Sequence, residues 1–353
     1  MVFWLPKSEL IIVILCILWY LVSSSNAIVT KTILSGFPYP MTVSIVQLAS
    51  IFLFLKPIVY YLGTPGKEVT FERRYFWRMI IPLALGKFTA SLSSHISMWK
   101  VPISYSHTVK STMPLFVVIL SRLITGERQT TKVYFSLLPI VAGVSIATVT
   151  ELSFNLIGLV FALMSAFLVS LLNIFSKNVM KEKPGLHHLS LLSIISKFAL
   201  LISLPAWIYM DLTSIVTSPH GMNSRTLTYL ILDGFLTFLQ NMIAFTVLSL
   251  VSPLTYSVCN SSKRIFVIVI SLVTMKNPIS FTNFFGMTVA VTGVFLYNRA
   301  KHEQNKAKEL PLYVNGQTKS QINLTKFTNP FVQNSVLTNG YKPHMNGHLV
   351  NYS

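Results

Sequence analysis

Charge is scarce in this chain, and negative charge is the scarcest. Asp, Glu, Lys and Arg make up 11% of the 353 residues, whereas a soluble domain carries about 25%. The 10 acidic residues are outnumbered by 28 basic ones, and hydrophobic residues make up 52% of the chain. This composition excludes an ordinary soluble domain and indicates a membrane protein that occupies a lipid bilayer.

Cysteine is also nearly absent. The two cysteines, Cys16 and Cys259, fall in apolar stretches, so they give no sign of a disulfide framework or of an oxidising compartment, and we expect no disulfide between them. The excess of basic residues is spread along short connections and a tail rather than gathered in one patch. That distribution argues against a nucleic-acid partner.

The motifs of membrane-embedded enzymes are missing. The chain has neither a His-Glu-x-x-His metal motif nor paired aspartates in facing helices. The adjacent His187 and His188 would point apart on a helix, which is a poor geometry for binding a metal. We therefore expect no catalytic residues, no metal and no cofactor, and the chain is not expected to be an enzyme.

Apolar runs of about 20 residues predict an all-α polytopic membrane protein with ten transmembrane helices. Turn-forming Gly and Pro clusters separate most of the runs. The predicted spans are 9–30, 40–62, 76–98, 103–123, 131–149, 154–178, 188–211, 226–250, 254–275 and 280–299.

The basic residues predict the orientation. Alternate connections hold Lys67, Arg73, Arg74, Arg78, Arg122, Arg128, Lys132, Lys177, Lys181 and Lys183, and more follow the last span; the other connections hold only Lys31, Lys100, Arg225 and Lys276. The positive-inside rule therefore places both termini in the cytosol. The first span is read as an uncleaved helix, because it has no small-residue cleavage site and no Arg/Ser-rich transit segment precedes it.

Two segments of the chain resemble each other at an offset of 151 residues. Residues 102–121 and 253–272 each begin with a Pro-x-Ser/Thr-Tyr-Ser pattern; the matched pairs are Pro102 and Pro253, Tyr105 and Tyr256, and Ser106 and Ser257. The offset corresponds to five helices, and an odd number reverses the second half in the membrane. We predict a lead over 1–8, two inverted five-helix repeats over 9–149 and 150–299, and a disordered cytosolic tail over 300–353.

Both copies carry cations into the membrane. Lys110 lies in the first copy, and Lys263 and Arg264 lie in the second. A charged side chain near the middle of a spanning helix costs about 2.5–3.5 kcal/mol, and few acids are placed to offset that cost. The three cations therefore predict a binding site for an anion, in which Arg264 binds two oxygens and the lysines act as point charges.

Other polar residues of the spans leave alternatives open. Lys87 and Lys197 could line a polar cavity or extend toward the interface, and Lys31 could border the cavity or anchor the helix end. His95 and His107 fit helix packing better than substrate contact. Gln240 and Asn241 face either a neighbouring helix or the cavity, and Tyr105 and Tyr256 are interfacial anchors or cavity walls. Gln240, Asn260 and Ser91 are expected to tune specificity.

At these residues the chain resembles the triose-phosphate translocator family of the nucleotide-sugar and drug/metabolite transporter superfamily, most closely subfamily E of solute carrier family 35. The resemblance covers about residues 10–300, with the runs ending at Lys110 and at Lys263-Arg264 as its most specific parts. It implies that these three residues bind the substrate phosphate. A histidine and a tyrosine used by plastid members are replaced by Ser91 and Gln240, which argues against triose phosphate or inorganic phosphate as the substrate. The missing transit segment argues against a plastid, and for a non-plastid member the resemblance implies a Golgi or other secretory-pathway membrane.

We therefore predict an antiporter that exchanges phosphorylated organic anions by alternating access, such as a nucleotide sugar or sugar phosphate for phosphate or a nucleotide. The expected substrate-binding residues are Lys110, Lys263, Arg264, Gln240, Asn260, Lys87 and Tyr256. The partners are then a phosphorylated small-molecule anion and the bilayer, and a homodimer is compatible with this prediction. The alternatives are a carrier for a non-phosphate metabolite and a membrane scaffold or receptor that does not transport.

Overall fold

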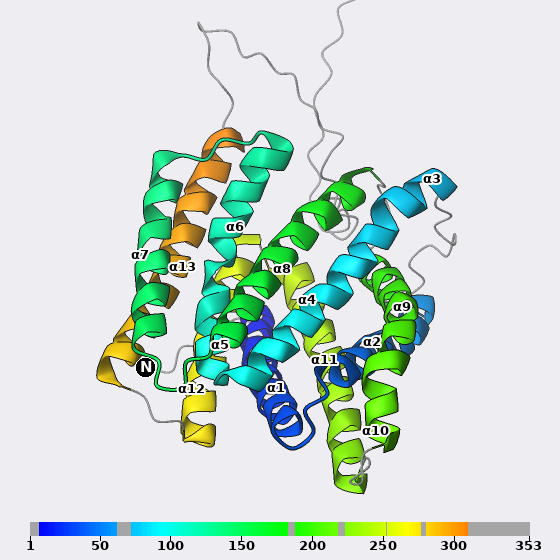
Figure 1. Ribbon diagram of the computed structural model, residues 1–353. Helices are drawn as coiled ribbons and strands as arrows, with labels where there is room; N and C mark the ends of the chain where they lie inside the picture. The colour runs from blue at the N-terminus through cyan, green and yellow to red at the C-terminus, as the bar shows by residue number, and fades with distance from the viewer. Residues whose placement is uncertain are drawn as a thin grey trace, which may run out of the picture. The chain divides into compact units, whose positions relative to one another are not determined.

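The computed structural model describes residues 7–61, 72–182, 188–217, 223–251, 253–276 and 280–309, and all the regular structure in these ranges is helical (Figure 1). The first half contains α1 (Lys7–Gly36), α2 (Pro40–Tyr61), α3 (Arg73–Tyr75), η1 (Phe76–Ile80), α4 (Ile81–Lys100), α5 (Ile103–Val109), η2 (Lys110–Thr112), α6 (Met113–Leu120), η3 (Ser121–Thr125) and α7 (Thr131–Val149). The second half contains α8 (Leu156–Glu182), α9 (His188–Trp207), η4 (Ile208–Leu212), α10 (Thr213–Thr217), α11 (Ser224–Leu250), α12 (Pro253–Met275) and α13 (Phe281–Glu309).

The protein is a polytopic membrane protein. Within the described ranges, eight helical segments are long and apolar enough to cross a bilayer. Helices α4 and α13 have 20 and 29 residues but are not among the eight. Lys87, His95 and a run of serines reduce the hydropathy of α4, and polar residues do the same in α13. The predicted number of ten spans is therefore not confirmed.

The helix boundaries differ from the prediction mainly at the ends of the chain. Helix α1 continues to Gly36, and α13 continues to Glu309, ten residues past the predicted end at 299. The extension of α13 carries an Arg299–Glu303 pair one turn apart (3.5 Å), and Glu303 also accepts from Lys132 at the start of α7 (3.2 Å). Lys132 and Arg299 hold the pKa of the Glu303 carboxyl below its ordinary value. Residues 1–6 and 310–353, which include most of the predicted lead and tail, lie outside the described ranges.

The core is formed by contacts between helices that are distant in the sequence. Helix α1 packs against α11 and α12, α2 packs against α9 and α11, α4 packs against α8 and α9, and α6 packs against α8. One hydrophobic cluster between α2, α4, α8 and α9 contains Leu48, Leu83, Phe88 and Leu191. Both halves of the chain therefore contribute to each main packing contact.

Helices α7 and α13 run side by side (Figure 1) and approach each other through glycines. A Cβ atom on Gly143 would collide with the backbone nitrogen of Ala290, and one on Gly293 would lie 2.7 Å from the backbone nitrogen of Ile140. Residue numbers rise along α7 as they fall along α13, so the two helices are antiparallel. Only glycine allows backbones to come this close.

Candidate functional site

The first predicted cation lies at a break between two helices. Helix α5 ends at Val109, Lys110 begins a single 3₁₀ turn, and α6 starts at Met113. The break has a local cause: Pro114 has no N–H to give to the carbonyl of Lys110, so the chain tightens and Met113 donates to that oxygen instead. The Nζ of Lys110 donates to Ser94 Oγ of α4.

Arg264 of the uninterrupted helix α12 reaches this break. Its Nη1 donates to the carbonyl oxygen of Lys110 at 2.7 Å, and its Nη2 lies 2.8 Å from the sulfur of Met113. The guanidinium therefore joins the second half of the chain to the point where the first half is interrupted. The structure brings Lys110 and Arg264 together, as the duplicated segments predicted.

Lys263 has a different environment from its neighbour. Its Nζ lies 4.7 Å from the centre of the Trp19 ring of α1, within the range of a cation–π contact. The Trp19 ring in turn stacks on Tyr256, with centroids 5.5 Å apart and an angle of 21°. Tyr256 therefore supports the aromatic ring on which Lys263 lies.

The three cations share one electrostatic environment. Arg264 is near enough to Lys110 and Lys263 for their charges to repel, and all three act on His107. In the described part of the chain, the ion pairs involve only Lys132, Arg299 and Lys301 with Glu303 and Glu127, so no carboxylate pairs with this cluster. The site therefore carries an unbalanced positive charge.

The buried acids are bound elsewhere by neutral groups. Asp233 of α11 is fully buried and accepts hydrogen bonds from Thr30 Oγ1 at 2.5 Å and Gln47 Nε2 at 2.8 Å. Asp211 accepts from the backbone N–H and the hydroxyl of Thr42, both at 2.8 Å. Neither acid neutralises the cation cluster, which strengthens the case for an anionic ligand there.

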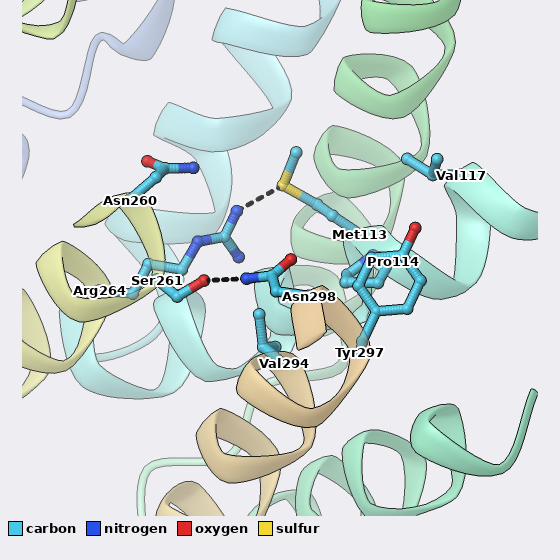
Figure 2. A pocket seen from close by; sticks show the side chains of 9 residues that line it. All are labelled: Met113, Pro114, Val117, Asn260, Ser261, Arg264, Val294, Tyr297 and Asn298. Carbon is cyan, nitrogen blue, oxygen red and sulfur yellow. Dashed lines mark hydrogen bonds between the residues drawn. The ribbon is translucent and has the colours of Figure 1, made fainter. Parts of the chain in front are cut away.

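A cavity of about 120 Å³ lies beside Arg264, between α6, α12 and α13 (Figure 2). Its lining is polar on the α12 side, where Asn260 and Arg264 lie, and Asn298 of α13 donates to Ser261 Oγ at 2.7 Å. Met113, Pro114, Val117, Val294 and Tyr297 complete the wall. The structure thus places Asn260 on the same cavity as Arg264.

Three of the remaining polar residues have hydrogen-bond partners that hold helices together. His95 packs, since its Nδ1 lies 2.7 Å from Ser44 Oγ, and Tyr105 is fully buried with its hydroxyl donating to Thr148 at 3.1 Å. Lys31 donates to three backbone oxygens at the end of α4, of Met98 (2.6 Å), Trp99 (3.3 Å) and Val101 (3.0 Å). These three residues thus serve helix packing in this structure.

Lys197, Lys87 and Gln240 differ from these packing residues. Lys197 is exposed on α9, with its Nζ 5.6 Å from the ring of Phe198, so it does not belong to the cluster. Lys87 and Gln240 are half-buried and have no hydrogen-bond partner in the described part of the chain. Among the described residues, no hydrogen bond joins Gln240 to the three cations.

Three residues that position the cations were missed from the sequence: Ser94, Trp19 and Met113 contact Lys110, Lys263 and Arg264, respectively. The repeated segments identified the cations, but a serine, a tryptophan and a methionine are ordinary residues of apolar helices. Their roles depend on how α1, α4 and α6 pack, which no local pattern revealed.

Comparison with known proteins gives consistent results. A family model described as the Triose-phosphate Transporter family matches residues 10–298. The glucose-6-phosphate/phosphate translocator 1, chloroplastic, of Arabidopsis thaliana is 33% identical over 293 residues, which cover 80% of this chain and 73% of that protein. The phosphoenolpyruvate/phosphate translocator 3, chloroplastic, of Oryza sativa subsp. japonica is 35% identical over 297 residues, covering 82% and 74%.

Two further similarities concern a fungal protein and the fold. A Schizosaccharomyces pombe protein named as a transporter is 31% identical over 315 residues, covering 84% of this chain and 68% of that protein. A chain in a solved crystal structure aligns with a TM-score of 0.52 at 13% identity, covering 84% of this chain and 98% of that one. The structural match supports the fold alone.

Proposed function

Because the chain belongs to the Triose-phosphate Transporter family, we propose that it is a secondary-active antiporter for phosphorylated organic anions. It exchanges a nucleotide sugar or sugar phosphate for phosphate or a nucleotide by alternating access. The observation that carries this proposal is the cluster of Lys110, Lys263 and Arg264, which come from both halves of the chain and have no acidic partner in the described part. The relatives are named as phosphate translocators, which supports transport rather than catalysis.

In this proposal, the phosphate replaces the missing acid. Arg264 offers a planar pair of donors, and the two lysines add point charges around the same oxygens. Ser94 and Trp19 hold the lysines in place between transport cycles. Asn260 and Gln240, with Tyr256 as a wall, would then contact the organic part of the substrate.

The same charges favour exchange over one-way flow. An empty carrier would have to pass through an occluded state with three mutually repelling cations and little water, which is costly in a membrane. A bound phosphate removes much of that repulsion and links α6 to α12. The loaded carrier is therefore expected to cross readily, and the empty carrier slowly.

We further propose ten spans arranged as inverted repeats over 9–149 and 150–299, with α4 and α13 as the third and tenth. A helix of 20 residues is about 30 Å long, enough to cross the hydrocarbon core. The packing supports the repeat: α1 contacts α11 and α12, and its counterpart α8 contacts their counterparts α4 and α6. Gly143 of α7 contacts Ala290 of α13, and Gly293 of α13 contacts Ile140 of α7. Because 143 corresponds to 293 and 140 to 290 in the proposed repeat, the second contact is the first with the two halves exchanged.

The location and orientation follow from the charges and from the family. We propose that both termini are cytosolic, because the basic connections lie on one side. We also propose a Golgi or other secretory-pathway membrane. The similarity to a fungal transporter supports a family that extends beyond plastids, although the plant relatives are named as chloroplastic.

The test is exchange by purified protein in liposomes loaded with phosphate and challenged with labelled phosphate, sugar phosphates, nucleotides and nucleotide sugars. Wild type should show saturable exchange, and Lys263→Ala should lose it. Lys197→Ala is the matched control, because Lys197 is exposed on α9 and should leave exchange unchanged. If folded wild-type protein exchanges no phosphorylated anion, the proposed function is wrong.

A further inference from the structure

Lys87 lies on the inner face of α4, away from the lipid. Helix geometry turns about 100° per residue, so Ser91 and Ser94 lie on the same face as Lys87, one and two turns further along. Leu85, about 160° around the helix, is 47% exposed and marks the outer face. Lys87 itself is half-buried. Its side chain is thus directed into the helix bundle.

No group compensates the charge of Lys87 in the described part of the chain, where it forms neither a hydrogen bond nor an ion pair. Other lysines of the spans have partners: Lys31 donates to three carbonyl oxygens, Lys110 donates to Ser94, and Lys263 lies over Trp19. A cation held inside a membrane bundle without a partner is expensive, and in such proteins it commonly serves a ligand.

A polar row connects Lys87 to the phosphate site. Ser94, at the far end of the row, accepts a hydrogen bond from Lys110 Nζ. Ser91, between Ser94 and Lys87, is half-buried and has no hydrogen-bond partner in the described ranges. Seven residues of helix separate Lys87 from Ser94, a rise of about 10 Å. The cation cluster and Lys87 thus lie at opposite ends of one hydroxyl-lined face.

We propose that Lys87 and Ser91 form a second anion subsite, so that the substrate is a phosphate ester carrying another acidic group up to about 10 Å from the phosphate. This inference rests on the proposed function, since the phosphate bound by Lys110, Lys263 and Arg264 fixes one end of the substrate. A lysine is a point charge without the fork geometry of arginine, so the second group is either a phosphate or a carboxylate.

Matched competitors test the subsite. Liposomes loaded with phosphate take up labelled phosphate in competition with glucose 6-phosphate, 6-phosphogluconate or fructose 1,6-bisphosphate. The first compound has one acidic group; the second adds a carboxylate and the third a second phosphate at the far end of six carbons. Wild type should bind at least one of the doubly acidic compounds at least tenfold more tightly than glucose 6-phosphate, and the better one identifies the second acid.

In Lys87→Gln that ratio should fall to about one, whereas Lys87→Arg, which keeps the charge, should retain most of it. Lys197→Gln is the control and should keep the wild-type ratio. Thermal unfolding of the purified variants, with and without each compound, checks that they are folded and measures binding without transport.

Two outcomes separate the two proposals. If wild type exchanges phosphate but binds all three sugar compounds equally, or if Lys87→Gln keeps the wild-type ratio, the second subsite is wrong and the antiporter stands. If wild type neither exchanges nor binds phosphate, the antiporter itself is wrong and the subsite falls with it.

Discussion

Replacing Lys263 by methionine is expected to stabilise the empty protein slightly while abolishing exchange. Methionine keeps the length and apolar stem of the side chain and fills irregular space well. What it removes is the ammonium group, whose contact in this structure is with the Trp19 ring at 4.7 Å. The net effect on stability therefore depends on two opposing terms.

The magnitude follows from those terms. A desolvated cation–π contact contributes about 2 kcal/mol, and the charge costs about 2.5–3.5 kcal/mol near the middle of a spanning helix. Removal should therefore raise the free energy of unfolding by about 0.5–1.5 kcal/mol. For a protein of this size, that corresponds to an increase in Tm of about 1–3 °C. Relief of the repulsion from Arg264 acts in the same direction.

The assay pairs thermal unfolding of detergent-purified protein with phosphate exchange in liposomes. Lys263→Met should unfold at or slightly above the wild-type temperature and should show no saturable exchange. Lys197→Met, at an exposed position on α9, should match wild type in exchange. A Tm several degrees below wild type would mean that Lys263 holds the fold together, and the reasoning above would be refuted.

Three further predictions concern stability and packing. Gly143→Val should lower the Tm by several degrees, because even a Cβ atom at this position collides with the backbone of α13. Gly36→Ala is the control and should have little effect, because no atom lies within 4 Å of the added Cβ. Asp233→Asn should cost about 1–3 kcal/mol of unfolding free energy, since it replaces a buried acceptor that two donors satisfy; an unchanged denaturation midpoint would contradict this. A mild oxidant such as diamide should cross-link Cys16 to Cys259, whose sulfurs lie 3.6 Å apart, and mass spectrometry of peptides should detect the disulfide. If samples that contain no unfolded protein form no cross-link, α1 and α12 hold these sulfurs apart.

The duplicated segments made the three membrane cations recognisable in the sequence. The shared Pro-x-Ser/Thr-Tyr-Ser pattern placed Lys110 and Arg264 in corresponding segments, and the structure joins them by a 2.7 Å hydrogen bond. The same pattern could not reveal Trp19 or Ser94, because the partner of a membrane cation is chosen by helix packing across the bundle. Likewise, no local pattern reveals that Asp233 is fully buried and satisfied by neutral donors on two other helices.

The ends of a helix could be predicted where an apolar segment ends. They were harder to predict where the helix continues beyond the apolar segment through polar residues that favour helix. Residues 299–309 are rich in Ala, Lys, Glu and Gln, which favour helix, and Arg299 and Glu303 pair one turn apart. Hydropathy alone therefore ended the last helix too early. In α4 the same polar character that keeps it out of the eight apolar spans also forms the face on which Lys87 and Ser94 lie.

The glycine contact between α7 and α13 has an evolutionary consequence. On the proposed repeat, residues 143 and 293 occupy one ancestral position, and so do 140 and 290. In a half-size ancestor, the same contact would join two separate copies inserted in opposite directions across the bilayer. Fusion of two such genes would have turned an interface between molecules into the interior of one. A homodimer of the present chain must therefore use another surface, because the ancestral one is already occupied within each molecule.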